Sequence, residues 1–172
     1  LLDTKTKPDI QVHLVAKQWA WDFNYLDADV YETSAHVELE DAQGKAKVRA
    51  EQPIMYLPVG KRVEFILNAR DVIHSFWVPA FLQKLDMIPG RVNRFQVVPT
   101  QEGTFKGKCA ELCGAYHSQM LFKVKVVTQA EYDAHMAELK SMGQVGQLDN
   151  TRNREPVYGP DLKMIPTSTG SN

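Results

Sequence analysis

This sequence has few cysteines, no surplus of charge of one sign and no long apolar run. Only two cysteines occur in 172 residues, but a chain of this length can bury a core without disulfide staples, so one domain is the default expectation. The 20 basic and 21 acidic residues leave a formal net charge of -1. Because there is no basic stripe of the kind that nucleic-acid binding requires, we expect no nucleic-acid partner.

The sequence also lacks an apolar run approaching the roughly 18 to 20 residues that a helix needs to cross a bilayer. Its N-terminus has no charged-then-apolar pattern typical of a signal peptide. We therefore expect the chain as given to be a soluble domain. Leu1 and Leu2, which precede the polar Asp3, are compatible with the end of an apolar helix further upstream.

Most of the chain has the two-residue periodicity of β-strands. Aromatic residues fall at every second position from Trp19 to Tyr25, which places them on one face of a strand. Alternation over 62–69 and 121–127 predicts two more strands, and 37–48 reads as a hairpin with a charged outer face. Prolines punctuate the runs at intervals that suit loops: Pro53, Pro58, Pro79, Pro89 and Pro99. This pattern predicts an all-β fold, an antiparallel sandwich or barrel.

One helix is expected near the C-terminus, over 128–142. Thr128 and Glu131 make a capping box, and Tyr132, Met136 and Leu139 then recur at helical spacing until a glycine ends the pattern. Residues 143–172 are rich in Gly, Asn, Thr, Ser and Pro and have little apolar periodicity. We therefore expect one domain over 1–142 followed by an extended C-terminal tail over 143–172.

The chemistry concentrates in the segment from Cys109 to Met120. These twelve residues contain two thiols, which belong to the two cysteines of the chain, together with the imidazole of His117 and a thioether. These soft and borderline donors suit copper better than calcium or magnesium. A mononuclear blue-copper site needs one thiolate, two imidazoles and a weak axial thioether, so the second thiolate is one sulfur too many for it. Two coppers bridged by both sulfurs would use it.

A second imidazole must come from elsewhere in the chain, and His74 is the best candidate. It follows an apolar strand and precedes Pro79, which marks a loop at the end of the sandwich. His13 and His36 lie in polar alternating runs and His135 lies on the expected helix, so we expect these three at the surface.

Four segments together closely resemble cytochrome c oxidase subunit II. They are HSFWVP at 74–79, DMIPGR at 86–91, the cysteine segment at 109–120 and QWAW at 18–21, and the resemblance covers about 10–25 and 52–127. The resemblance implies a cupredoxin-like Greek-key β-sandwich and a mixed-valence two-copper centre, called CuA. It further implies the electron-transfer subunit of a proton-translocating haem-copper oxidase, in which oxygen is reduced by another subunit.

The same resemblance implies a set of metal ligands: His74, Cys109, Glu111, Cys113, His117 and Met120. The two cysteines would bridge both coppers. His74 and Met120 would complete one copper, and His117 and the backbone carbonyl of Glu111 the other. The Glu111 side chain would point away and help to hold a magnesium ion at the boundary with subunit I.

The resemblance also implies partners and a location. Trp19 matches an exposed tryptophan through which electrons arrive from cytochrome c, and Asp71 matches an acidic docking residue. Asn24 stands where the family often has an acidic residue, so a rearranged docking surface and a membrane-tethered cytochrome are open alternatives to a soluble donor. The family's two transmembrane helices are absent here, and its location is the extracytoplasmic face of a respiratory membrane. The polar insertion at 27–50 and the tail are candidates for contacts with further subunits.

Other interpretations remain open. Cys109 and Cys113 could form a disulfide, or they could bind structural zinc together with His74 and His117, which would leave Met120 without a role. A different copper reductase, such as nitrous oxide reductase, has the same cysteine and histidine spacing, although 74–79 and 86–91 favour the oxidase. A β-sandwich binding module with a zinc or disulfide staple is the third class.

Overall fold

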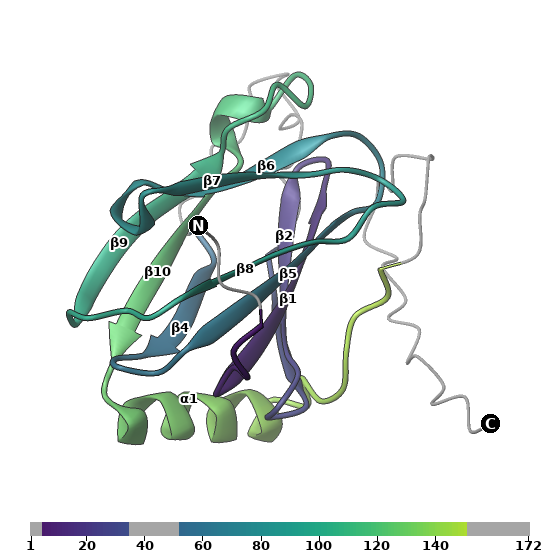
Figure 1. The fold of residues 1–172 in the computed structure, drawn as a ribbon. Coiled ribbons are helices and arrows are strands. Elements are labelled where there is room, and N and C mark those ends of the chain that lie inside the picture. Colours follow the sequence, from purple (N-terminus) through teal and green to yellow (C-terminus); the bar gives the residue numbers. More distant parts are fainter. Residues whose placement is uncertain (1–4, 35–51, 151–172) are drawn as a thin grey trace.

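Two five-stranded β-sheets pack face to face, with one helix at one end of the sandwich (Figure 1). This computed structural model describes residues 5–34 and 52–150. The elements in chain order are β1 (Ile10–Lys17), β2 (Ala20–Tyr25), β3 (Val30–Thr33), β4 (Ile54–Pro58), β5 (Val63–Ala69), β6 (His74–Val78), the 3-10 helix η1 (Pro79–Phe81), β7 (Gln83–Met87), β8 (Asn93–Val97), β9 (Gly103–Cys109), the 3-10 helix η2 (His117–Gln119), β10 (Leu121–Val127) and α1 (Gln129–Ser141).

The strand order confirms the predicted all-β sandwich. One sheet runs β3-β2-β1-β5-β8 and the other β4-β10-β9-β6-β7, so the chain passes repeatedly from one sheet to the other. The expectation of purely antiparallel pairing was wrong. β1 pairs with β5, and β4 with β10, in parallel, because strands joined through the opposite sheet can return in the same direction.

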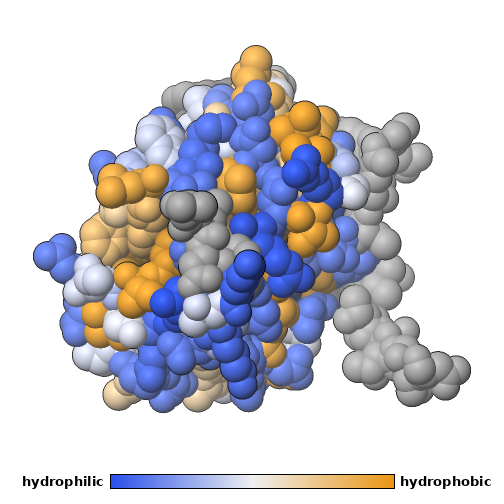
Figure 2. All heavy atoms as spheres, in the orientation of Figure 1, coloured by the Kyte–Doolittle hydropathy of each residue, from blue (hydrophilic) through white to orange (hydrophobic). Residues whose placement is uncertain are grey.

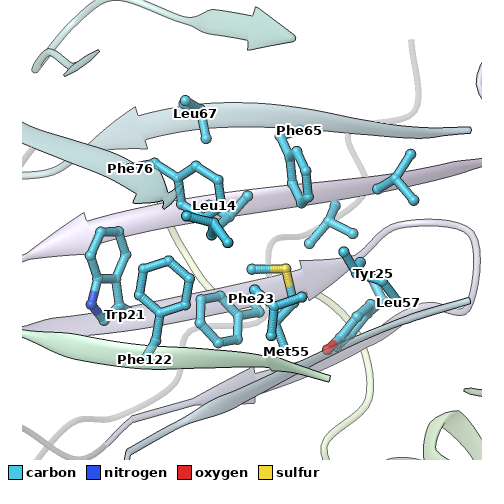
Figure 3. Close-up of a cluster of buried hydrophobic side chains, with 14 of the residues drawn as sticks. Leu14, Trp21, Phe23, Tyr25, Met55, Leu57, Phe65, Leu67, Phe76 and Phe122 are labelled. Atoms are coloured by element: carbon cyan, nitrogen blue, oxygen red, sulfur yellow. The ribbon is translucent and has the colours of Figure 1, made fainter. Parts of the chain in front are cut away.

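Aromatic side chains fill the space between the sheets, as the alternation at 19–25 predicts. Trp21, Phe23 and Tyr25 of β2 are buried, and the ring of Phe122 from β10 lies 4.9 Å from Trp21 and 5.2 Å from Phe76 of β6 between ring centroids (Figure 3). Gly107 of β9 faces this cluster, because a Cβ there would overlap the Phe122 ring. Each fully buried aromatic of this kind contributes about 1.5–3 kcal/mol. This cluster holds the two sheets together, and the loops at their ends therefore start from fixed positions.

The predicted C-terminal helix is confirmed. The Thr128 hydroxyl accepts from the Glu131 backbone N–H while the Glu131 carboxylate accepts from the Thr128 backbone, which is the expected capping box. Tyr132, Met136 and Leu139 are the buried residues of α1. Figure 1 shows α1 at the end of the sandwich opposite the loop between β9 and β10. None of the described helices is long and apolar enough to cross a membrane.

The first part of the predicted polar insertion belongs to a sheet. Residues 30–33 form β3, which pairs with β2, while residues 35–50, including His36 and the predicted hairpin, lie outside the described part of the chain. The start of the predicted tail also lies along this edge. Val145 bridges to Val30, and the Leu148 N–H donates to the Asn24 side chain at 2.7 Å. Residues 151–172 lie outside the described residues.

Two expectations about polar residues on this sheet were wrong. His13, expected at the surface, is buried, and its ring bonds with the side chains of Asn68 at 2.9 Å and Asn150 at 3.5 Å. Burial lowers the pKa of His13, against the opposing effect of that hydrogen bond. Asn24 is fully buried between the His13 carbonyl and the Leu148 N–H, so it lies on no docking surface.

The outer surface mixes polar and apolar residues. On the face drawn in Figure 2, hydrophilic residues predominate and apolar ones interrupt them in separate places. Among the exposed apolar side chains are Leu82, 93% exposed, and Leu112, 78% exposed. Because Leu112 lies between the two cysteines in the sequence, an apolar side chain projects from the segment that carries the predicted ligands.

Candidate metal centre

The loop between β9 and β10, which carries most of the predicted ligands, lies at the end of the sandwich opposite α1 (Figure 1). Cys109 is the last residue of β9 and Met120 directly precedes β10, and a backbone hydrogen bond of 3.0 Å between them closes the intervening loop. β6 lies beside β9, with Phe76 opposite Cys109, and this pairing brings His74 to the loop. His74 follows the apolar strand β5, as expected, and is the first residue of β6, two strand positions from Phe76.

Each cysteine has its own imidazole. The Cys109 and Cys113 sulfurs are 3.8 Å apart. His74 Nδ1 is 3.9 Å from the Cys109 sulfur, and His117 Nδ1 is 3.6 Å from the Cys113 sulfur. The ligand atoms of His74, Cys109 and Cys113 all lie within 4.8 Å of one another, and this group does not include His117. The two imidazoles therefore approach the pair of sulfurs separately, each beside a different cysteine.

Two weaker donors complete the arrangement. The Met120 thioether sulfur lies 3.9 Å from the Cys113 sulfur, and the backbone oxygen of Glu111 lies 3.2 Å from the Cys109 sulfur. Met120 is only 1% exposed, so its thioether is turned inward. Two thiolates, two imidazoles, a thioether and a carbonyl are soft and borderline donors that suit copper. The structure thus brings all six predicted ligand residues together.

The geometry bears on the two simpler interpretations. A disulfide needs a sulfur–sulfur distance of about 2.0 Å, whereas these sulfurs are 3.8 Å apart and both cysteines are free thiols. A tetrahedral zinc site would gather His74, Cys109, Cys113 and His117 around one point. His117 lies outside the compact group, and the buried Met120 thioether would be unused.

The cysteine pair shares its protons unequally. A hydrogen bond from the Cys113 thiol, helped by the contact with His74, brings the pKa of Cys109 down to about 3 against the opposing effect of burial. The same interaction with Cys109, together with burial, raises the pKa of Cys113. One thiolate is therefore available at neutral pH, and binding a metal at both sulfurs must release the proton of the other thiol.

Asp71 anchors His74 from behind. Its carboxylate lies 2.8 Å from His74 Nε2 and accepts from the backbone N–H groups of Gln18 and Val72. Burial alone would raise the pKa of Asp71, but these three bonds outweigh it and lower that pKa. Burial alone would lower the pKa of His74, but the bond to Asp71 helps to raise it. With Nε2–H donating to Asp71, Nδ1 is left free as the ligand atom. The Asp71 side chain is only 12% exposed and has three hydrogen-bond partners. Its role in docking a partner stays a prediction.

Replacing Asp71 by Asn is expected to weaken copper binding about 10- to 100-fold, because carboxylates that orient a histidine ligand typically have effects of that size. A competition titration against a copper chelator measures the change. Asp86→Asn is the matched control, since the Asp86 carboxylate is bound to the ammonium group of Lys84 and to no ligand. Equal affinities for the two variants would contradict the anchoring role.

Trp19 packs against the metal loop and is less accessible than expected. It is 8% exposed, and its ring lies 4.9 Å from that of Tyr116. Gly114, at φ +128°, permits this approach, because a Cβ there would lie 2.8 Å from the Trp19 ring. The expectation that Trp19 is exposed was wrong, because the metal loop covers its ring. Its role in electron transfer stays a prediction. Tyr116 was missed because no local pattern singles it out.

Gln18 is a second residue whose role the sequence did not reveal. Its side-chain amide donates to the Cys113 carbonyl at 2.8 Å, and its backbone N–H donates to Asp71 at 2.6 Å. The peptide bond that joins it to Trp19 is cis. The segment before β2 thus holds the metal loop from one side and the anchor of His74 from the other.

A sandwich of two sheets in this order, with a loop of thiolate, imidazole and thioether donors at one end, defines a cupredoxin-like metal-binding domain. Comparison with known proteins identifies the family. The family model of the cytochrome c oxidase subunit II periplasmic domain matches residues 10–127, and the chain belongs to the cytochrome c oxidase subunit II family. Membership in this family implies copper binding.

Individual relatives agree with this assignment. A probable cytochrome c oxidase subunit 2 from Streptomyces avermitilis is 43% identical, over 90% of this chain and 59% of the relative, so the chain spans somewhat more than half of that protein. The periplasmic domain of subunit II of cytochrome oxidase from Bradyrhizobium japonicum matches at a TM-score of 0.67 with 30% identity, over 80% of this chain and 97% of that domain. A subunit II solved in a mixed disulfide intermediate with a thioredoxin-like protein matches at 0.64 with 30% identity, over 83% of this chain and 99% of that one.

Proposed function

We propose that this chain is the electron-accepting domain of a haem-copper oxidase and that it holds a binuclear copper centre. Cys109 and Cys113 would provide thiolates to both coppers. His74 and Met120 would provide the remaining ligands of one copper, and His117 and the Glu111 carbonyl those of the other. When bound, the copper pair supplies a one-electron acceptor whose charge is shared over two metals.

The observation that carries the proposal is that the two imidazoles approach the pair of sulfurs separately. His74 approaches Cys109 and His117 approaches Cys113 at similar distances, 3.9 and 3.6 Å, with the two sulfurs 3.8 Å apart between them. A single metal needs all its strong donors around one point, whereas two metals that share both sulfurs need a donor on each side. The described geometry fits the second requirement.

The protein's own contribution is to keep these donors fixed and dry. His74 is fully buried, and the two cysteines and Met120 are nearly so. Asp71 fixes the His74 ring, and Gln18 fixes the Cys113 carbonyl. Because His74, the two cysteines and Met120 are buried and two of the donors are held by hydrogen bonds, the site should rearrange little when it gains an electron. The apolar surroundings, which include Trp21 and Phe76, also help to set the redox potential.

The partners follow from the family. We propose that a c-type cytochrome, soluble or membrane-tethered, delivers electrons through Trp19, and that subunit I receives them at its haem. There oxygen is reduced and protons are translocated, on a respiratory membrane whose extracytoplasmic side carries this domain. The name of the matching family model, a periplasmic domain, supports that side. The partly buried Glu111 side chain is proposed to help hold magnesium at the boundary with subunit I.

The test is an anaerobic titration of the copper-loaded chain with ferrous cytochrome c, followed by the absorbance of both proteins. The proposal expects each chain to oxidise about one equivalent of cytochrome, because a copper pair that shares its charge accepts electrons singly. The zinc-loaded chain is the control and should oxidise none. Failure of the copper-loaded chain to oxidise any cytochrome, although ascorbate reduces it, would contradict the proposed donor.

A further inference from the structure

Five lysines gather on the outer face of the sheet that carries the metal loop. This lysine face consists of Lys84 on β7, Lys106 and Lys108 on β9, and Lys123 and Lys125 on β10. The register puts them on one side. Lys123 lies directly opposite Lys106, and Lys108 lies opposite Trp77 of β6, which in turn lies opposite Lys84. The alternate residues of β10 point into the core, so the lysines point to solvent.

This arrangement opposes the stability of the sheet. Like charges directly opposite on neighbouring strands are destabilising, and the sequences of β9 and β10 contain no acidic residue that could relieve them. Asp86 is bound to Lys84 at 2.7 Å, and Glu131, at the start of α1, is close enough to Lys125 to be affected by its charge. An arrangement that lowers stability without a compensating contact is expected at a functional surface.

The clustering also divides the charge of the molecule. The whole chain is nearly neutral, with a formal net charge of -1. A face rich in lysine therefore leaves the excess of negative charge on the rest of the chain. Such a division directs a charged partner to one side of the protein and speeds its association.

Two of the lysines are held over aromatic rings. Lys108 Nζ lies 4.8 Å from the centre of the Trp77 ring, and Lys125 Nζ lies 5.1 Å from the centre of the Tyr56 ring. These contacts keep long side chains in place before a partner arrives, which lowers the entropy lost on binding. The rings lie under the ammonium groups, and the face therefore lacks the protruding aromatic side chains by which proteins insert into lipid.

The lysine face leads directly to the metal centre. Lys108 immediately precedes Cys109, and β10 begins immediately after Met120. Figure 1 shows β9 and β10 running side by side up to the loop between them. A protein seated at this end of the face therefore lies beside the loop against which Trp19 packs.

We propose that the lysine face docks the electron donor and that this donor presents a carboxylate-rich surface. The inference rests on the proposed function and adds the polarity of the partner. It is opposite in sign to docking at Asp71, which would select a basic donor and whose carboxylate is engaged in three internal hydrogen bonds. Steering by exposed charge suits a contact that forms and dissociates rapidly.

The experiment compares two forms of one probe, a lysine-rich cytochrome c and the same cytochrome after succinylation, which converts its lysines to carboxylates. Binding to the full copper-loaded chain is measured by titration at low ionic strength with both proteins oxidised, so that no electron transfer is needed. The test variant is Lys106→Glu/Lys123→Glu. The control, Lys7→Glu/Lys61→Glu, makes the same charge change at exposed lysines outside the face.

We expect the wild-type chain to bind the succinylated form more tightly than the native form. The test variant should bind it about tenfold or more weakly, ~1.4 kcal/mol, and the control should change it less than about twofold. The difference should disappear in high salt, where exposed charges are screened. A matching loss in the rate at which the reduced probe donates its electron would support the docking role.

Two outcomes would overturn the inference. One is equal binding by the test and control variants. The other is that Lys106→Glu/Lys123→Glu abolishes binding to vesicles of anionic lipid but leaves binding of the succinylated cytochrome unchanged, which would assign the face to a membrane. The affinities do not depend on electron transfer. A copper-loaded chain that binds as expected but accepts no electron from any reductant would therefore contradict the proposed function and not the docking surface.

Discussion

The Cys113→Ser chain, loaded with copper, is expected to lose the signal of a shared electron and to bind at most one copper in place of about two. The Cys113 sulfur lies 3.6 Å from His117 Nδ1, 3.9 Å from the Met120 sulfur and 3.8 Å from the Cys109 sulfur. A serine hydroxyl stays protonated at neutral pH and cannot bridge two coppers as a thiolate does. Electron paramagnetic resonance and the metal-to-protein ratio measure the two effects.

Cys109→Ser should give the same result, because each sulfur is proposed to contact both coppers. Ser118→Ala is the matched control within the loop, since Ser118 is exposed and carries none of the proposed ligand atoms. Retention of the two-copper signal in either cysteine variant would rule out bridging. Met120→Leu separates the remaining interpretations, because copper should be retained with an altered spectrum, whereas a zinc site would be indifferent to the change.

Replacing Trp19 by Leu is expected to slow reduction of the copper centre by cytochrome c at least about tenfold, equal to ~1.4 kcal/mol of activation free energy. Trp19, directly before β2, contacts the metal loop at Gly114 and Tyr116. Its loss removes the conjugated group nearest to that side of the loop. Stopped-flow mixing of the oxidised chain with ferrous cytochrome c measures the rate.

Because Trp19 also supports the loop, the copper site of Trp19→Leu must be shown to be intact before its rate is compared with that of the wild-type chain. The spectrum and the rate of reduction by ascorbate should match those of the wild-type chain. Trp77→Leu is the parallel variant, since Trp77 is partly exposed and lies opposite Lys108, the residue before Cys109. If Trp77→Leu slows the reaction and Trp19→Leu does not, electrons arrive through the lysine face and the role given to Trp19 is wrong.

Local patterns in the sequence were enough to predict the elements that build the site. Alternation of apolar residues located β5 and β10, and a capping box with helical spacing located α1. The donors at 109–120 identified the loop, because five of the six proposed ligand residues lie within it and their chemistry is unusual. His74 was found by its position near the end of a strand, even though it begins β6.

The features that the sequence did not reveal depend on contacts between distant residues. Gln18 and Asp71 are 53 positions apart, and no periodicity could show that they meet behind His74. His13 and Asn24 are buried where Leu148 and Asn150 lie against them, and no local pattern shows a contact over more than a hundred positions. Trp19 was expected to be exposed because the sequence does not show that the loop around Gly114 lies over it.

The most direct test of the central claim is the electron paramagnetic resonance spectrum of the oxidised, copper-loaded wild-type chain, recorded together with its copper content. The account predicts the hyperfine pattern of one electron shared equally by two coppers, at about two coppers per chain. The pattern of a single copper, or a silent spectrum from a chain that has taken up zinc instead, would contradict it.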